Sequence, residues 1–301
     1  MDAQMDTERP SPRYADIDVW DPADILDAML EGQFAAVAAV RAVLDAIERA
    51  AAAIEGRLSD GGRLVYAGAG TSGRLAVQDG AELMPTFNWP SERLLLLMAG
   101  GEQAMLRAVE GAEDEPAQAD ELIRRHQINS KDALVAVAAS GTTPFTVTCM
   151  RAARDLGALT VGIANNAATP LLTESDHAIF LQTGAEPIAG STRMNAGTAQ
   201  RVTLNLLSTL VMIRLGRVYR GLMVDVQATN TKLTRRKEEM LVYLTGRSRE
   251  EAQAAIAAAD GDLKLAVLLL HGCEAERARA LLAKANGRLR TALALLAPPG
   301  F

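Results

Sequence analysis

Short apolar runs alternate with amphipathic stretches between about residues 63 and 181. The runs have the length of strands and are rich in Leu, Val, Ile and Ala; they lie at 63–67, 93–98, 133–138, 158–163 and 178–181. Apolar positions with helical spacing separate them, at about 73–83, 102–110, 117–127, 143–155 and 167–173. Strands that alternate with helices are joined by right-handed crossovers. The pattern therefore predicts an α/β fold with a doubly wound, mainly parallel five-stranded sheet, covered by helices on both faces.

The segment before this sheet has two parts. Two prolines break any helix within residues 1–20, so this part is expected to be irregular. The pair Asp21-Pro22 then resembles an N-cap followed by proline at the first helical position. An alanine-rich helical pattern follows to about residue 57, and we expect it to be interrupted around Glu31-Gly32.

The end of the chain contains an internal near-repeat. Residues Ala259–Leu270 align with Ala285–Leu296, and each copy places a glycine-containing turn before a leucine-striped helix. The tail resembles the small three-helix modules of ubiquitin-associated domains, and its expected role is to pack against the main domain. The sequence is thus divided into an N-terminal segment (1–20), a main domain (21–245) and an all-helical module (246–301).

Composition narrows the possible functions. The formal net charge of −6 gives no basic field for nucleic acid, and the basic run Lys232–Lys237 is expected to be a solvated face. The two cysteines and three histidines have no ligand spacing, so no metal site is expected. The acidic N-terminus lacks an apolar signal segment, and the most apolar helix candidate, 202–215, is too polar to span a bilayer. A cytoplasmic protein without membrane contact is predicted.

Two loops carry the candidate chemistry. The stretch Leu64–Arg74 runs from a strand through three glycines and two hydroxyls into a helix, and Ser140–Pro144 repeats the strand-to-helix arrangement with three hydroxyls. Glycines let backbone N–H groups approach an anion closely, and the start of a helix adds favourable potential. Thr142 or Thr143 can cap the second helix. Because the carboxyl ends of parallel strands share one edge, the two loops are expected to bind one phosphate-bearing ligand.

The first loop has two other interpretations. It can be an ordinary strand-to-helix turn, and Gly68, Gly70 and Gly73 also match the dinucleotide fingerprint GxGxxG. A dinucleotide site needs an acidic residue about 20 positions further on. Glu102 lies about 30 positions beyond the loop, which is too far, so the sequence favours a terminal phosphate.

Seven motifs together resemble a known family. They are Gly68–Leu75, Asp79–Thr86, Ala99–Gly101, Ala108–Asp114, Ala139–Phe145, Gly190–Ala199 and Leu222–Asn230. They resemble phosphosugar-binding domains of the sugar isomerase (SIS) type and, within that superfamily, the N-acetylmuramic acid 6-phosphate etherases. Order and spacing agree over roughly residues 15–295, which is far more specific than one glycine loop.

The resemblance implies a lyase of cell-wall amino sugar recycling. Such etherases cleave the D-lactyl ether at C3 of their substrate by elimination and then hydration, giving N-acetylglucosamine 6-phosphate and D-lactate. One group removes the C2 proton and another protonates the leaving oxygen. By resemblance these are Glu113 as base and Glu82 as acid, with the reverse assignment left open. Neither a cofactor nor a metal is required.

The resemblance also assigns the binding residues. The phosphate is expected to be held by loop hydroxyls and backbone N–H groups: Gly70, Thr71, Ser72 and Gly73; Ser140, Gly141, Thr142 and Thr143; and Ser191 with Thr192. Arg193 pairs with the phosphate, with the lactyl carboxylate, or with a structural partner. Members of the family that the chain resembles usually have arginine where this chain has Thr142 and lysine where it has Asn195. They usually have an Arg-Asn pair where it has Pro10-Ser11. Losing these groups can weaken binding or shift substrate preference.

Two other functions remain open. An aldose–ketose phosphosugar isomerase on the same fold also removes a proton beside a carbonyl, but it has no lactate to release. A non-catalytic phosphosugar sensor, resembling glucokinase regulatory protein, would typically carry two tandem sugar-binding domains, and this chain has room for one. In each case the partner is a sugar phosphate. The helix-rich flanks further suggest a homodimer with sites near its interface.

Overall fold

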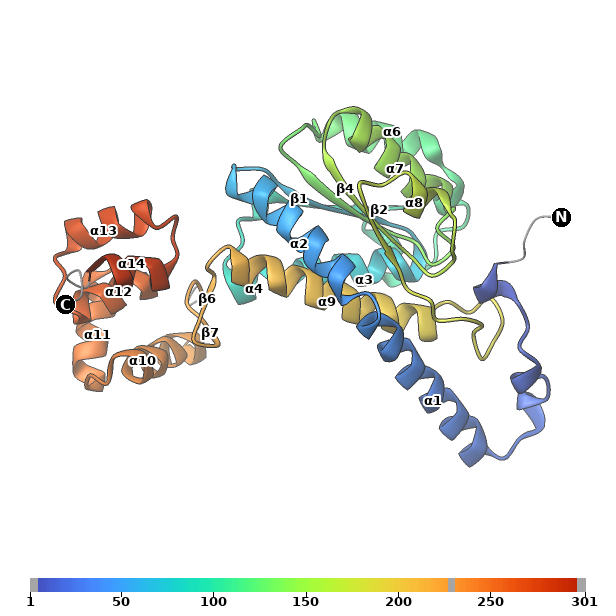
Figure 1. The fold of residues 1–301 in the computed structure, drawn as a ribbon, viewed down its shortest axis with the longest axis horizontal. Helices are drawn as coiled ribbons and strands as arrows, with labels where there is room; N and C mark the ends of the chain where they lie inside the picture. The colour runs from blue at the N-terminus through green and yellow to red at the C-terminus, as the bar shows by residue number, and fades with distance from the viewer. Residues whose placement is uncertain (1–4, 227–230, 297–301) are drawn as a thin grey trace. The chain divides into compact units, whose positions relative to one another are not determined.

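The computed structural model describes residues 5–226 and 231–296 (Figure 1). It divides into two compact units. The first contains Met1–Ala81 and Ser91–Leu210, and the second contains Glu82–Pro90 and Val211–Phe301. Each unit has its own hydrophobic core, so they are described one after the other.

The first unit is built on one parallel sheet. Its strands, in the order β2-β1-β3-β4-β5, are β2 (Leu94–Met98), β1 (Leu64–Gly68), β3 (Ala133–Val137), β4 (Leu159–Ala164) and β5 (His177–Phe180). The predicted doubly wound sheet is confirmed, and each strand bound differs from the predicted one by at most one residue. The strand order reverses between β1 and β3, which is where such sheets bind ligands.

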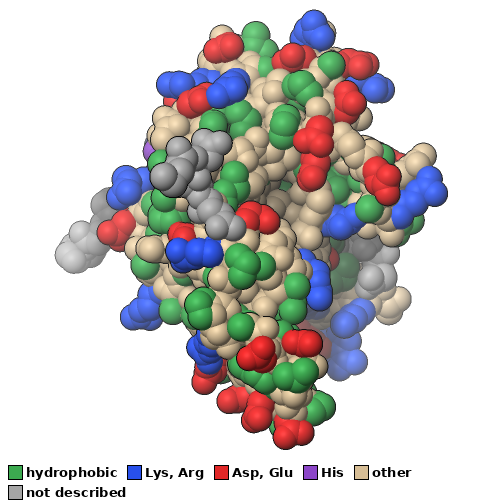
Figure 2. Space-filling view, turned by 90° about the vertical axis from the view of Figure 1, so that its right-hand side faces the viewer, with side chains coloured by type: hydrophobic (Ala, Val, Ile, Leu, Met, Phe, Trp, Pro, Cys, Tyr) green, Lys and Arg blue, Asp and Glu red, His purple; other side chains and the backbone are tan. Residues whose placement is uncertain are grey.

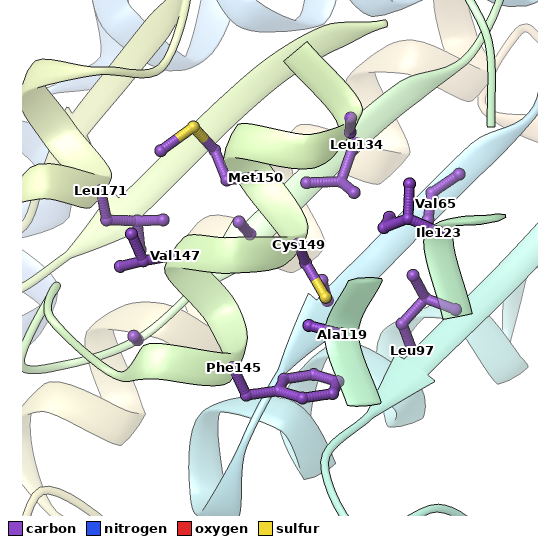
Figure 3. Packing of buried hydrophobic residues seen from close by; sticks show 14 of the residues in the cluster. Val65, Leu97, Ala119, Ile123, Leu134, Phe145, Val147, Cys149, Met150 and Leu171 are labelled. Atoms are coloured by element: carbon purple, nitrogen blue, oxygen red, sulfur yellow. The ribbon is translucent and has the colours of Figure 1, made fainter. Parts of the chain in front are cut away.

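Helices cover both faces of this sheet (Figure 1). One face carries α6 (Pro116–Arg125), α7 (Pro144–Asp155) and α8 (Pro170–Thr173). The other carries α2 (Leu44–Ser59) and α3 (Gly70–Ala81), and α9 (Asn195–Arg214) begins against α3. Between the sheet and helices α6 and α7, fully buried apolar side chains pack against one another, including Val65, Ile123, Leu134, Phe145 and Met150 (Figure 3). Burying one such side chain stabilises the fold by about 1.5–3 kcal/mol.

The expected interruption around Glu31-Gly32 is wrong. Helix α1 (Pro22–Arg41) runs through these residues, and the helical structure is interrupted only at Ala42-Val43, before α2. Gly32 serves packing, because a Cβ there would lie 2.8 Å from the Asn195 Oδ1. Asp21 at the N-cap and Pro22 at the first helical position are confirmed.

The helix expected at 102–110 is much shorter than predicted. Only α5 (Gln103–Leu106) forms, followed by a loop and a 3₁₀ turn over Ala112–Asp114. The loop folds back onto Gly100, whose Cβ position lies 3.0–3.2 Å from the Cβ atoms of Val109, Ala104 and Ala112. Gly100 has a φ of 77°, so this tight return favours glycine at that position.

The segment before α1 forms three 3₁₀ turns, η1 (Asp6–Glu8), η2 (Pro12–Tyr14) and η3 (Ile17–Val19). Thr7 is fully buried. The Asn166 side chain donates to the Thr7 Oγ1 (2.9 Å) and to the Ala139 carbonyl (2.9 Å), while Gly190 N donates to the Thr7 carbonyl (2.9 Å). The N-terminal segment is therefore fastened to loops at the carboxyl edge of the sheet.

The second unit combines short elements with the helical tail. Its elements are α4 (Leu83–Phe87), β6 (Val218–Tyr219), β7 (Leu222–Met223), α10 (Thr231–Thr245), α11 (Arg249–Ala258), α12 (Leu263–Leu270), α13 (Ala275–Lys284) and α14 (Leu289–Leu296). Arg217 donates to the Phe87 and Asn88 carbonyls (3.1 and 3.0 Å) and stacks on Trp89. Residues of α10, such as Leu241, share one core with α11–α14.

The two repeat turns have the same geometry. Asp260-Gly261 has φ values of 52° and 81°, and Asn286-Gly287 has 50° and 71°. Lys237 Nζ donates to the Gly261 carbonyl and Lys264 Nζ to that of Gly287, both at 2.8 Å. The expectation of a solvated face is therefore wrong for Lys237, which is buried, and burial lowers its pKa.

Candidate active site

The two predicted phosphate loops begin at the same level of the sheet. Strands β1 and β3 pair in parallel, with Gly68 opposite Val137, so the loops that follow them leave the sheet side by side. Helix α3 follows the first loop and α7 follows the second. The structure thus brings the loops together where the strand order reverses, as such a ligand site requires.

The start of α3 lies directly on the sheet because of its glycines. A Cβ on Gly73 would lie 2.4 Å from the Met98 Sδ and 2.7 Å from the Gly68 carbonyl, and Gly70 has a positive φ of 53°. Thr71 and Ser72 occupy the first turn, and within the described residues their N–H groups have no acceptor outside the helix. Such unsatisfied N–H groups at a helix start suit an anion.

A cavity of about 430 Å³ opens beside this loop. Its walls come from the loops that follow β1 and β2, and they include Thr71, Arg74 and Glu113. Glu113 is exposed and lies in the 3₁₀ turn that follows the positive-φ Gly111. The fold-back of this loop brings Glu113 to the wall of the cavity.

Arg74 is a cavity residue to which sequence reasoning gave no role. It is half-buried, and its Nε donates to the Ala104 carbonyl at 2.8 Å. The signal that would have found it is spacing, since Arg74 lies three residues after Thr71 and so on the same face of α3.

The second loop is held by its own hydroxyls. Ser140 Oγ lies 3.1 Å from Thr143 Oγ1, and Thr142 N donates to Ser140 Oγ at 3.2 Å. Gly141 has φ 71°, and its Cβ position is 2.1 Å from the Thr169 Oγ1, so only glycine fits. Thr143 occupies the N-cap position of α7, but its hydroxyl lies against Ser140 and accepts no hydrogen bond from a helix N–H.

The third loop approaches the first one. Ser191 and Thr192 are partly exposed, and a Cβ on Gly197 would lie 3.2 Å from the Thr192 carbonyl oxygen and 3.6 Å from the Thr71 Cγ2. Arg193 is exposed and forms no ion pair within the described part of the chain. The contact at Gly197 brings the Ser191–Thr192 loop to the phosphate loop.

Glu186 is a buried carboxylate that sequence reasoning missed. It accepts hydrogen bonds from the N–H groups of Asn195 (2.8 Å) and Ala196 (2.9 Å), at the start of α9. Burial raises its pKa, while these two hydrogen bonds act in the opposite direction. The start of α9 is therefore occupied by the protein's own anion.

Glu82 is the second residue expected to act in catalysis. It is exposed, follows the last residue of α3 and is the N-cap residue of α4. Glu82 is not among the residues that line the cavity beside Glu113.

Neither a metal centre nor a membrane-spanning helix is found in the described ranges. They contain no group of three or more His, Cys, Asp or Glu side chains arranged to hold a metal ion. None of their helices is both long and apolar enough to cross a bilayer. The cysteines, Cys149 and Cys273, are free and buried.

Sequence comparison places this site in a family. The chain is 48% identical to the N-acetylmuramic acid 6-phosphate etherase of Deinococcus radiodurans, over 88% of this chain and 87% of that protein. It is 44% identical to the N-acetylmuramic acid 6-phosphate etherase of Streptomyces avermitilis, over 89% and 86% respectively. The chain belongs to the N-acetylmuramic acid 6-phosphate etherase family. The resemblance carried by the seven motifs is thereby confirmed.

Broader comparisons agree on the fold of this etherase family member. Residues 45–154 match the glucokinase regulatory protein N-terminal SIS domain, and residues 114–210 match the SIS domain. A solved structure of a candidate phosphosugar isomerase from Bacteroides fragilis is 23% identical, with a TM-score of 0.50 over 65% of this chain and 94% of that one. At this identity the likeness confirms the SIS fold alone.

Proposed function

We propose that this chain cleaves the D-lactyl ether of N-acetylmuramic acid 6-phosphate, in the cytoplasm and as part of cell-wall amino sugar recycling. The products are D-lactate and N-acetylglucosamine 6-phosphate. One observation carries the proposal in a member of this family: Glu113 and the phosphate loop at Thr71 line the same cavity. A base beside an anchored phosphosugar is what the elimination step requires.

The 6-phosphate binds at the start of α3. The N–H groups of Thr71 and Ser72 and their hydroxyls donate to its oxygens, and the helix dipole favours its charge. Ser140 and Thr143 approach from the neighbouring strand, and the Ser191–Thr192 loop from α9. Anchoring at this point directs the rest of the open-chain sugar toward the cavity.

Glu113 then accepts the proton from C2, and lactate leaves from C3. Glu82 protonates the leaving oxygen, and water adds to the double bond afterwards. Because Glu82 is not among the described residues that line the cavity beside Glu113, we infer that Glu82 acts in the site of a second copy. The active form in this proposal is a homodimer with sites near its interface.

An apolar stripe on α1 supports a homodimer. Leu26, Leu30 and Phe34 are 64%, 51% and 66% exposed, although they follow one another at four-residue spacing on one face of the helix. A groove of about 370 Å³ continues this face between α1 and α9. Hydrophobic side chains lie at the surface in the lower part of Figure 2, among acidic ones. Exposed apolar stripes of this kind mark protein–protein contacts.

The test combines Glu82→Gln and Glu113→Gln with an assay of free D-lactate. Each variant alone is expected to lose lactate release by about 10²–10⁴-fold, because an acid or a base is removed. Each should still bind N-acetylglucosamine 6-phosphate in calorimetry, which serves as the control for folding. Lactate release that persists in Glu113→Gln would contradict the assigned base. Sugar-phosphate binding without any lactate from the unchanged protein would favour a non-catalytic sensor.

Mixing the two variants tests the second copy. If the two glutamates of a site come from different subunits, subunit exchange creates one complete site in each mixed dimer. An equal mixture should then recover about a quarter of the normal activity, by the statistics of a twofold dimer. No recovery, after exchange has been demonstrated, would place both glutamates in one chain.

A further inference from the structure

We propose that Arg74 binds the carboxylate of the substrate's lactyl group and so selects lactyl ethers over sugar phosphates without that acid. This inference rests on the proposed function, because it assigns a part of the same substrate to a residue of the same cavity. It concerns binding and selection, not the removal or delivery of a proton.

Arg74 is the single cation among the described residues that line the cavity. The charged side chains there are Arg74, Glu110 and Glu113. Within the described part of the chain Arg74 forms no ion pair, and its one hydrogen bond joins Nε to the Ala104 carbonyl. That bond fixes the plane of the guanidinium and leaves the two Nη groups without a protein partner. A fork of two N–H donors matches the geometry of a carboxylate.

The strand order decides which end of the substrate Arg74 meets. The loops after β2 and β3 lie on opposite sides of β1. The described residues that line the cavity come from the β1 loop, the start of α3, the end of β2 and the segment that follows β2, and none comes from Ser140–Thr143. The phosphate lies between the β1 and β3 loops, so Arg74 and Glu113 share the other side. In this arrangement Arg74 lies beside the reacting carbons. The lactyl group is attached at C3, next to C2, from which Glu113 removes the proton.

The substrate carries two anionic groups, the lactyl carboxylate and the phosphate, and the test must distinguish them. Residues three apart on a helix have Cβ atoms about 5–6 Å apart, so Arg74 is also a neighbour of Thr71 and of its phosphate. N-acetylglucosamine 6-phosphate carries the phosphate without the lactyl group. Comparing this ligand with N-acetylmuramic acid 6-phosphate therefore distinguishes the two anions.

The experiment measures binding in a background that does not turn over. Calorimetry with Glu113→Gln, alone and combined with Arg74→Gln or Arg74→Lys, gives the affinity for both sugar phosphates. Arg74→Gln should weaken binding of the lactyl ligand by about tenfold to hundredfold, as for a charged hydrogen bond, and that of N-acetylglucosamine 6-phosphate by less than about twofold. Arg74→Lys should fall between, because the charge stays and the fork is lost.

Arg201→Gln is the matched control. Arg201 lies 3.7 Å from Asp79 in the same unit and does not line the cavity, so its loss should change neither affinity. In the otherwise unchanged enzyme, Arg74→Gln should raise KM more than it lowers kcat.

Two results would overturn the assignment. Equal weakening of both ligands would make Arg74 a phosphate residue, and no weakening of either would leave it a purely structural tie to Ala104. The binding data do not depend on catalysis. Arg74-dependent discrimination together with no lactate release would therefore contradict the proposed reaction while supporting the role of Arg74.

Discussion

Helices α3 and α9 begin next to one another, yet only one of these helix starts is closed. At α9 the buried Glu186 accepts the N–H groups of Asn195 and Ala196. At α3 no described residue accepts those of Thr71 and Ser72. The two starts meet where Gly197 faces the Thr71 methyl group. The fold thus supplies an internal anion for one helix start and leaves the other for a ligand.

Electrostatics explains why the two starts must differ. Each helix start carries roughly half a positive charge, so two adjacent open starts repel each other and attract anions. A buried carboxylate on α9 neutralises one start and fixes its position. The α9 start therefore shows, within the protein, the hydrogen-bonding arrangement that we propose for phosphate on α3. It also anchors the neighbouring loop that contains Ser191 and Thr192.

The largest expected effect comes from adding one methyl group at the start of α3. Gly73→Ala places a Cβ 2.4 Å from the Met98 sulfur and against the Gly68 carbonyl, which forces α3 away from the sheet. We expect destabilisation by about 3 kcal/mol in urea unfolding, and loss of sugar-phosphate binding.

Gly197→Ala is the matched change at α9. Its nearest neighbour is the Thr192 carbonyl at 3.2 Å, and the gain in helix propensity opposes this tight contact. The free energy of unfolding should change by less than about 1 kcal/mol. Similar effects of the two variants would mean that α3 is not held more tightly to the sheet than α9 to its loop.

A smaller effect is expected from the hydroxyls. The double variant Thr71→Val, Ser72→Ala keeps the backbone N–H groups but removes two donors from the open start. Binding of N-acetylglucosamine 6-phosphate in calorimetry should weaken by about tenfold or more, since hydrogen bonds to a charged group are worth about 1.5–3 kcal/mol.

The control for the hydroxyls lies at the closed start. Thr198→Val removes a hydroxyl of α9 that donates to the Gln33 side chain, and it should leave the affinity unchanged. If Thr198→Val weakened binding as strongly as the double variant, the closed start would also face the ligand.

The open start could be predicted from the sequence, whereas the closed one could not. Three glycines and two hydroxyls between a strand and a helix are a local pattern, and local patterns survive without the fold. Glu186 precedes Asn195 by nine residues and meets it only because the chain turns back after β5. No spacing rule connects a capping acid with a helix at that separation.

The same limit applies to glycines and to the cavity. In the sequence, Gly32 looks like a helix breaker, but its real neighbour is Asn195, which is remote along the chain. Arg74 is visible in the loop motif, yet its role depends on the return of the β2 loop to Ala104. Strand positions were predictable because buried parallel strands are continuous apolar runs.

The smallest expected effect concerns the charge that closes α9. Burial raises the pKa of Glu186, so the folded protein binds this proton more tightly than the unfolded chain does. The contribution of Glu186 to stability is therefore complete below its unfolded pKa, about 4.3, and is lost as the pH rises through its folded pKa. A difference of one between the folded and unfolded pKa of Glu186 would change the free energy of unfolding by about 1.4 kcal/mol.

Glu186→Gln isolates this charge. The amide loses one acceptor for the α9 N–H groups at every pH, so its direct cost of about 1 kcal/mol does not depend on pH. Urea unfolding of both proteins between pH 4 and pH 8 should therefore show the unchanged protein losing its advantage over the variant as the pH rises. A constant difference would mean that Glu186 has the same pKa in both states. A growing advantage would mean that the hydrogen bonds from the two α9 N–H groups outweigh burial and that the closed start favours the ionised carboxylate.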